Sequence, residues 1–93
     1  MRKEDIANQI TDLIGVTPVV FSRGSTEPKE FFVQVIEALG LEVEKDFTKP
    51  ELARLIVESS GNIWLDSYES NGSTITREGL LAVKNAVEFF LGK

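Results

Sequence analysis

The sequence contains an internal repeat, and this constrains the possible folds more than any other feature. Residues 2–15 align with residues 48–61, and residues 22–39 align with residues 70–87 after a shift of two positions. A repeated sequence predicts a repeated structural unit, and a unit this short buries too little surface alone, so we expect the two copies to share one core. The identical pairs are Lys3/Lys49, Ala7/Ala53, Ile10/Ile56, Gly15/Gly61, Ser22/Ser70, Gly24/Gly72, Ser25/Ser73, Thr26/Thr74, Glu30/Glu78, Val35/Val83 and Ala38/Ala86.

Apolar residues recur at spacings of three and four in four stretches, and a glycine follows close behind each one. This spacing places an apolar stripe on one face of a helix, and glycine readily takes the left-handed conformation that ends a helix. The predicted helices span 3–14, 27–39, 49–60 and 76–91. The fold class is therefore all-α: two pseudo-symmetric helix–loop–helix repeats with one shared core, with short extended segments allowed in the loops.

The 93 residues are expected to form one domain. The first repeat covers 2–39, a link covers 40–47, and the second repeat covers 48–87, with the last helix continuing beyond it. The third helix has the clearest start, because Thr48 and Glu51 fit a capping box and Phe47 and Leu52 are placed to form a hydrophobic staple. The link is short and acidic, and its alternating apolar residues indicate an extended, packed segment.

Composition excludes several classes of function. The sequence has no cysteine and no histidine, which leaves no ligands for a cysteine–histidine zinc site and no thiol nucleophile. Acid–base catalysis would lack its commonest residue. We therefore expect no enzyme, cofactor or metal site. The absence of cysteine favours the cytoplasm, and the charged N-terminus shows no signal-peptide pattern, nor does any apolar run reach membrane-spanning length.

Each repeat contains a Ser-x-Gly-Ser-Thr turn just before a predicted helix. One interpretation is helix capping by the hydroxyls. The other is an anion site, because such a turn offers free N–H groups and the positive end of a helix dipole beside a cation. Nearby Glu27, Glu30 and Glu78 can neutralise those cations. The candidate nucleic-acid contacts are Arg23, Gly24, Ser25, Thr26, Lys29, Asn71, Gly72, Ser73, Thr74 and Arg77.

Aromatic and acidic residues give further candidates. Trp64 and Tyr68 can anchor a partner or stack on a base, although such a tryptophan more often closes a small core. The apolar run 89–91 is too apolar for a fully solvated last turn, so it belongs to the core or to a dimer contact. Asp66 and Glu69 lack the spacing of a calcium loop and are expected to be solvated. The Glu27-Pro28-Lys29 segment has only half of a nuclease motif.

The second repeat resembles small accessory domains of bacterial restriction endonucleases and related DNA-processing proteins. The residues that carry this resemblance are Lys49-Pro50-Glu51-Leu52-Ala53, Gly61-x-x-Trp64 and Ser70-x-Gly72-Ser73-Thr74-Ile75-Thr76-x-x-Gly79-Leu80, and Gly24-Ser25-Thr26-x-Pro28-Lys29 in the first repeat is similar. The resemblance implies a DNA-associated helper module without catalytic content.

Two functions follow from the sequence. The first is a non-enzymatic nucleic-acid-associated module that contacts phosphates through the two turns, although the net charge of −5 departs from a typical DNA-binding domain. The alternative is a protein-interaction or homodimerisation module that uses Trp64, Tyr68 and the apolar C-terminal turn. Neither function involves a membrane.

Overall fold

The structure, a computed structural model, describes residues 2–17, 28–42, 47–70 and 74–92. These ranges contain a short 3-10 turn, a two-stranded sheet and four α-helices, so the prediction of a mainly helical fold with short extended loop segments is confirmed. The elements are α1 (Lys3–Ile14), α2 (Lys29–Ala38), α3 (Lys49–Ser59), η1 (Asp66–Tyr68), β1 (Glu69–Ser70), β2 (Thr74–Ile75) and α4 (Arg77–Leu91).

The helix boundaries lie within two residues of the predicted ones. The capping box of α3 is present: the Thr48 N–H donates to Glu51 Oε1 at 2.8 Å, and the Glu51 N–H donates to Thr48 Oγ1 at 3.4 Å. The predicted starts at 27 and 76 are too early, because Pro28 and Thr76 have extended backbones and act as the N-caps of α2 and α4. Gly15 and Gly61 have φ angles of 72° and 89°, as expected of glycines that end helices.

The aligned repeat coincides with several local features of the helices. Under the alignment the first residues of α1 and α3 correspond, and so do those of α2 and α4. The buried positions of α1 and α3 also correspond one to one: α1 buries Ile6, Ala7, Ile10 and Thr11, and α3 buries Leu52, Ala53, Ile56 and Val57, with Pro50 in addition. The helices of the two halves do not pack equally, since α4 lies against both α1 and α3 more extensively than α2 does. A twofold arrangement of the two halves stays a prediction.

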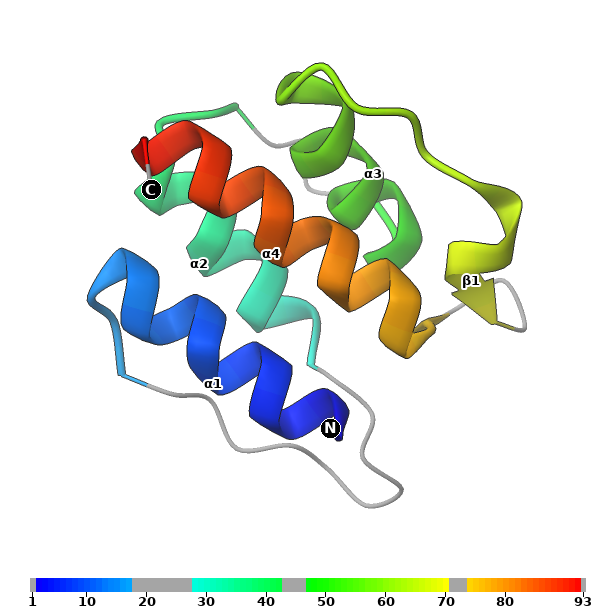
Figure 1. Cartoon of the computed structure of the whole chain (residues 1–93), viewed down its shortest axis with the longest axis horizontal. Coiled ribbons are helices and arrows are strands. Elements are labelled where there is room, and N and C mark those ends of the chain that lie inside the picture. Colours follow the sequence, from blue (N-terminus) through cyan, green and yellow to red (C-terminus); the bar gives the residue numbers. More distant parts are fainter. Residues whose placement is uncertain (1, 18–27, 43–46, 71–73, 93) are drawn as a thin grey trace.

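All four helices begin on the lower right side of the view in Figure 1 and end toward its upper left or top. Each connection must therefore return the chain to the side where the next helix begins. Between α3 and α4 this return includes η1 and the hairpin, in which Glu69 pairs with Ile75 and Ser70 pairs with Thr74 in antiparallel register. The hairpin thus lies beside the start of α4.

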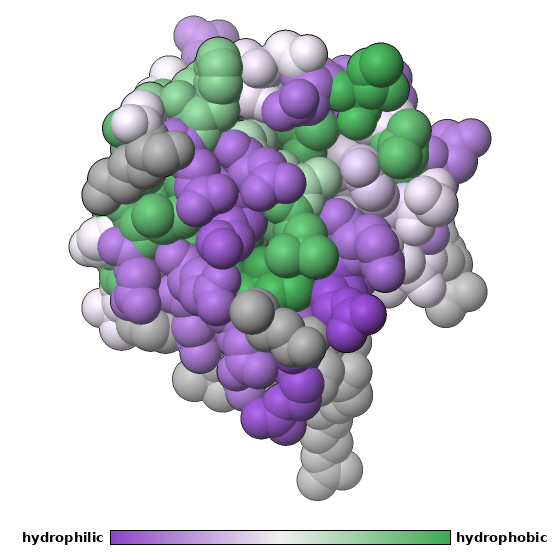
Figure 2. Space-filling model, in the orientation of Figure 1, coloured by the Kyte–Doolittle hydropathy of each residue, from purple (hydrophilic) through white to green (hydrophobic). Residues whose placement is uncertain are grey.

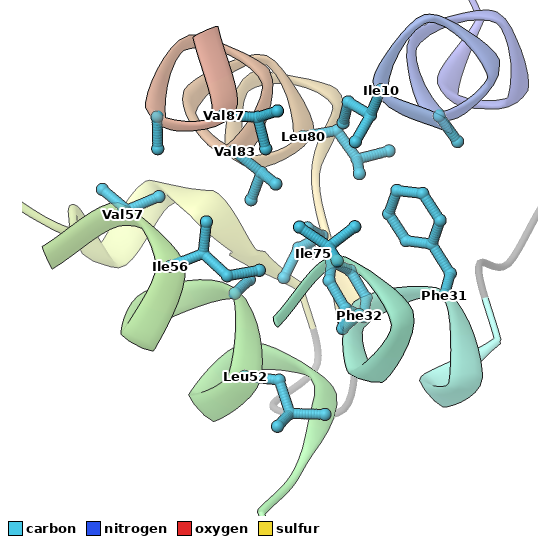
Figure 3. Packing of buried hydrophobic residues seen from close by; sticks show 14 of the residues in the cluster. Ile10, Phe31, Phe32, Leu52, Ile56, Val57, Ile75, Leu80, Val83 and Val87 are labelled. Carbon is cyan, nitrogen blue, oxygen red and sulfur yellow. The ribbon is translucent and has the colours of Figure 1, made fainter. Parts of the chain in front are cut away.

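One hydrophobic cluster receives side chains from all four helices and from β2 (Figure 3). Phe31 and Phe32 are both fully buried, with ring centroids 5.0 Å apart in an edge-to-face arrangement. Ile75 brings the hairpin into the same cluster. Leu41 and Phe47, at the two ends of the link, are half-buried against the cluster, as the alternating pattern predicts; the staple partner Leu52 is fully buried. In the described part of the chain, no helix is long and apolar enough to cross a membrane.

Candidate functional site

Most of the predicted nucleic-acid site lies outside the described residues. This applies to the whole of the first turn, and to Asn71, Gly72 and Ser73 in the second. Lys29 and Arg77 are described: they are the first residues of α2 and α4, and both are exposed. The prediction that these two cations sit at helix starts is therefore confirmed, whereas their role in binding is not tested by the geometry.

Thr74 does not lie at a helix start, so the interpretation of the second turn as a helix cap is wrong for this residue. Thr74 belongs to β2 and pairs with Ser70. The cap of α4 is Thr76, whose Oγ1 accepts the Gly79 N–H at 3.3 Å. The two described residues of the second motif, Ser70 and Thr74, thus pair across two antiparallel strands. The shared motif concealed this, because Ile75 and Thr76 align with Glu27 and Pro28, which differ from them in chemistry.

The electrostatic surroundings of Lys29 include the start of a neighbouring helix. Hydrogen bonds from the backbone and the side chain of Thr48 lower the pKa of Glu51 below 4.5, and the positive charge of Lys29 lowers it further. The Glu51 carboxylate therefore already offsets part of the positive charge of Lys29 at the start of α2. This weakens the case for a phosphate at Lys29.

The lowered pKa of Glu51 gives a pH dependence with a defined sign. The ionised carboxylate accepts hydrogen bonds only in the folded protein, so its contribution to stability is present above its unfolded pKa and is lost as the pH falls through the lower folded pKa. We expect the free energy of unfolding, measured by urea denaturation, to fall more steeply with acidification below about pH 4.5 in the wild type than in Glu51→Gln. Parallel curves for the two proteins would contradict this assignment.

The connection before α4 is held together by side-chain contacts. Trp64 is 9% exposed and belongs to the hydrophobic cluster, which confirms its role in closing the core. Its Nε1–H donates to Glu69 Oε2 at 3.0 Å, and its ring lies edge-to-face with Tyr68 at 5.1 Å. Thr76 closes the other side: its N–H donates to the Tyr68 carbonyl at 2.8 Å, and its hydroxyl donates to the Ser67 carbonyl at 3.1 Å. These contacts hold Trp64, Tyr68 and Glu69 in defined positions at the surface.

A glycine allows this segment to lie directly on α4. A Cβ atom at Gly79 would come within 2.8 Å of the Tyr68 carbonyl oxygen and 3.1 Å of the Tyr68 Cβ. Both distances are too short for a side chain to be added without movement. The absence of a side chain at Gly79 therefore fixes how closely Tyr68 approaches the helix.

A shallow pocket of about 380 Å³ lies where this segment meets the outer side of α4. The half-buried Tyr68 contributes an aromatic wall, and two amides and one carboxylate add polar groups. The residues that line it are Asn62, Tyr68, Glu78, Leu81, Ala82 and Asn85. The pocket is open, and its lining includes the exposed Leu81.

The large exposed hydrophobic residues of the described chain are all in α4 or in the loop before it. The loop residues Ile63 and Leu65 are 78% and 47% exposed. On α4, Leu81, Phe89 and Leu91 are 38%, 63% and 37% exposed. Figure 2 shows apolar side chains over α4 and over the loop beyond it, with polar side chains between them.

We define the α4 face as Leu81, Asn85 and Phe89 together with Ile63 and Leu65. Positions 81, 85 and 89 are four residues apart, so they lie in one row along the exposed side of the helix. Ile63 and Leu65 follow Asn62, which lines the same pocket as Leu81 and Asn85 and so brings the start of this loop near the row. The α4 face is thus one surface built from two segments.

Sequence reasoning found only part of this face. It identified Tyr68 and the run 89–91, and Phe89 proves to be exposed rather than part of the core. It missed Leu81, Ile63 and Leu65. A signal was present in α4, whose apolar residues cover more of the helix circumference than one stripe requires. No cluster of potential metal ligands occurs among the described residues.

Comparison of the chain with known protein families, curated proteins and solved structures returned no match.

Proposed function

We propose that this chain is a protein-interaction module that binds its partner through the α4 face. The observation that carries the proposal is that the large exposed hydrophobic residues of the described chain all belong to α4 or to the loop before it, and four of the five belong to the α4 face. Exposed apolar side chains scattered singly need no explanation, whereas a gathered apolar patch bordered by polar groups is typical of a protein contact. The amides of Asn62 and Asn85 and the carboxylate of Glu78 form such a border.

The way the face is built also supports binding. An interaction surface is more effective when it is held rigid before the partner arrives, because less conformational entropy is lost on association. Here Tyr68 is held by its contact with Trp64 and by the Thr76 N–H, and Gly79 keeps it close to α4. The core does not need Phe89 or Ile63, which are mostly exposed.

Site-specific photo-crosslinking tests this proposal in cells. A photoreactive residue placed at Phe89 or Ile63 should form adducts with a protein, whereas the same residue at Asp12, which is exposed on α1, should not. Mass spectrometry then identifies the adduct, and the purified pair should bind at least tenfold more weakly when Leu81 is changed to Asp. Equal adducts at all three positions, or none at any, would contradict the proposal.

A nucleic-acid function is the second candidate, and one observation favours it. All four helices begin on the same side of the molecule with a lysine or an arginine, which places four cations and four positive dipole ends on that side (Figure 1). The test is a salt titration of binding to duplex and single-stranded DNA. Phosphate contacts predict that log K falls steeply with log salt, and that Lys29→Ala with Arg77→Ala flattens the slope by up to about two units. An unchanged slope would remove this candidate.

A further inference from the structure

We infer that the partner of the α4 face is a basic protein that places an arginine side chain in the pocket lined by Tyr68 and Glu78. This inference rests on the proposed function and deepens it, because the pocket shares Leu81 and Asn85 with the α4 face. It follows from the charge of the pocket, from the polar atoms that its lining residues leave available, and from the apolar side chains beside them.

The charge of the pocket is negative. Of the described residues that line it, only Glu78 is charged, and neither cation of α4, Arg77 or Lys84, is among them. Within the described part of the chain, Glu78 forms no ion pair. A cationic group from a partner would therefore meet a carboxylate that has no intramolecular ion pair to break first, and such charge-assisted hydrogen bonds are the strong ones.

A chain of hydrogen bonds determines which atom of Asn62 is left for a partner. The Ser60 hydroxyl donates its hydrogen to the Val57 carbonyl at 2.6 Å, so the Ser60 oxygen can only accept a further bond. Asn62 Nδ2 donates that bond at 2.9 Å, which leaves Asn62 Oδ1 as an acceptor. The pocket thus combines carboxylate and amide oxygens. A guanidinium, which carries only N–H donors in a planar fork, matches such a set of acceptors.

The rest of the lining matches the remainder of an arginine side chain. Tyr68 is half-buried, and its ring is held edge-to-face against Trp64 with centroids 5.1 Å apart, so its position is set before a partner binds. A guanidinium plane stacks on an aromatic ring, which the ammonium of lysine cannot do. The methylenes of arginine pack along apolar surface, which Leu81 and Ala82 supply.

The charge of the whole chain favours the same kind of partner. The sequence has a net charge of −5, and Asp66 and Glu69 lie on either side of Tyr68 along the chain. Opposite charge attracts a basic partner over long range and raises the rate of association, and salt screens this attraction. We therefore expect the affinity for the partner to fall as salt is added. An affinity that rises with salt would contradict a basic partner.

Titration with a small arginine analogue tests the pocket itself. The probe is N-acetyl-arginine amide, and the control is N-acetyl-citrulline amide, which has a similar shape without the charge. In NMR spectra we expect the backbone amide signals of Tyr68, Glu78 and Asn85 to shift, with binding about tenfold tighter for the arginine analogue. Glu78→Gln should abolish this preference, whereas Glu88→Gln, on the same helix but outside the pocket, should retain it. Equal binding of the two analogues, or no shift with either, would overturn the inference.

The protein that is crosslinked at position 89 provides the second measurement. We expect it to bind Glu78→Gln about tenfold more weakly than it binds the wild type or Glu88→Gln, because one charge-assisted contact is lost. A partner that binds Glu78→Gln and the wild type equally overturns the inference and leaves the interaction function standing. The absence of any adduct at position 89 would remove both proposals.

Discussion

Replacing Phe32 with alanine is expected to lower the free energy of unfolding by about 3–5 kcal/mol. The side chain is fully buried and packs edge-to-face against Phe31, and in Figure 3 it lies close to Ile75 of the hairpin. The substitution removes apolar contacts and leaves a cavity between α2 and the rest of the core. Since small domains are stable by only about 5–15 kcal/mol, this loss is a large share of the total.

Urea denaturation followed by circular dichroism measures this effect. The matched control is Phe89→Ala, which removes the same atoms from a side chain that is 63% exposed and should change stability by less than about 1 kcal/mol. Similar losses in the two variants would show that the burial of α2 is not as described.

Replacing Gly79 with valine is expected to cost about 1–3 kcal/mol and to shift the segment that carries Tyr68 away from α4. The new Cβ would meet the Tyr68 carbonyl oxygen at 2.8 Å, the Tyr68 Cβ at 3.1 Å and the Ile75 Cβ at 3.3 Å. Two of these three atoms belong to Tyr68 of η1, and the closest is a backbone oxygen, which cannot rotate away. The hydrogen bond from the Thr76 N–H to the Tyr68 carbonyl should be weakened by the same movement.

The readouts are the free energy of unfolding and the fluorescence of Trp64, which is the only tryptophan and contacts Tyr68. Asn85→Val is the matched control: it places the same β-branched residue on the exposed side of the same helix, where no backbone lies in its way, and should change stability by about 0.5 kcal/mol or less. A Gly79→Val protein as stable as this control, with unchanged fluorescence, would contradict the close contact.

The helices were predictable because local physical chemistry determines them. The spacing of the apolar residues predicted the buried face of each helix. The capping box of Thr48 and Glu51 marked the start of α3 through hydrogen bonds between residues three apart. The glycine after each stripe marked its end. None of these signals requires knowledge of the tertiary structure, which explains why they were sufficient.

The site was less predictable because it depends on how distant segments meet. The hairpin was missed, since its strands have two residues each and alternation cannot be recognised over so short a length. The exposure of Leu81 and Phe89 depends on which sides of α4 are covered by α1 and α3. A stripe marks the apolar positions of a helix, but only packing decides which of them remain exposed.

The central claim is that the α4 face serves binding rather than folding, and Phe89→Asp tests it most directly when stability and association are measured on the same protein. The claim predicts that the free energy of unfolding falls by no more than about 2 kcal/mol, because the side chain is mostly exposed and the cost is that of an aspartate in the last turn of a helix. It also predicts at least a tenfold loss of binding to the protein that is crosslinked at position 89, since a carboxylate at this position loses hydration when a partner covers it. Wild-type association in this variant, or a loss of stability as large as that of Phe32→Ala, would contradict it.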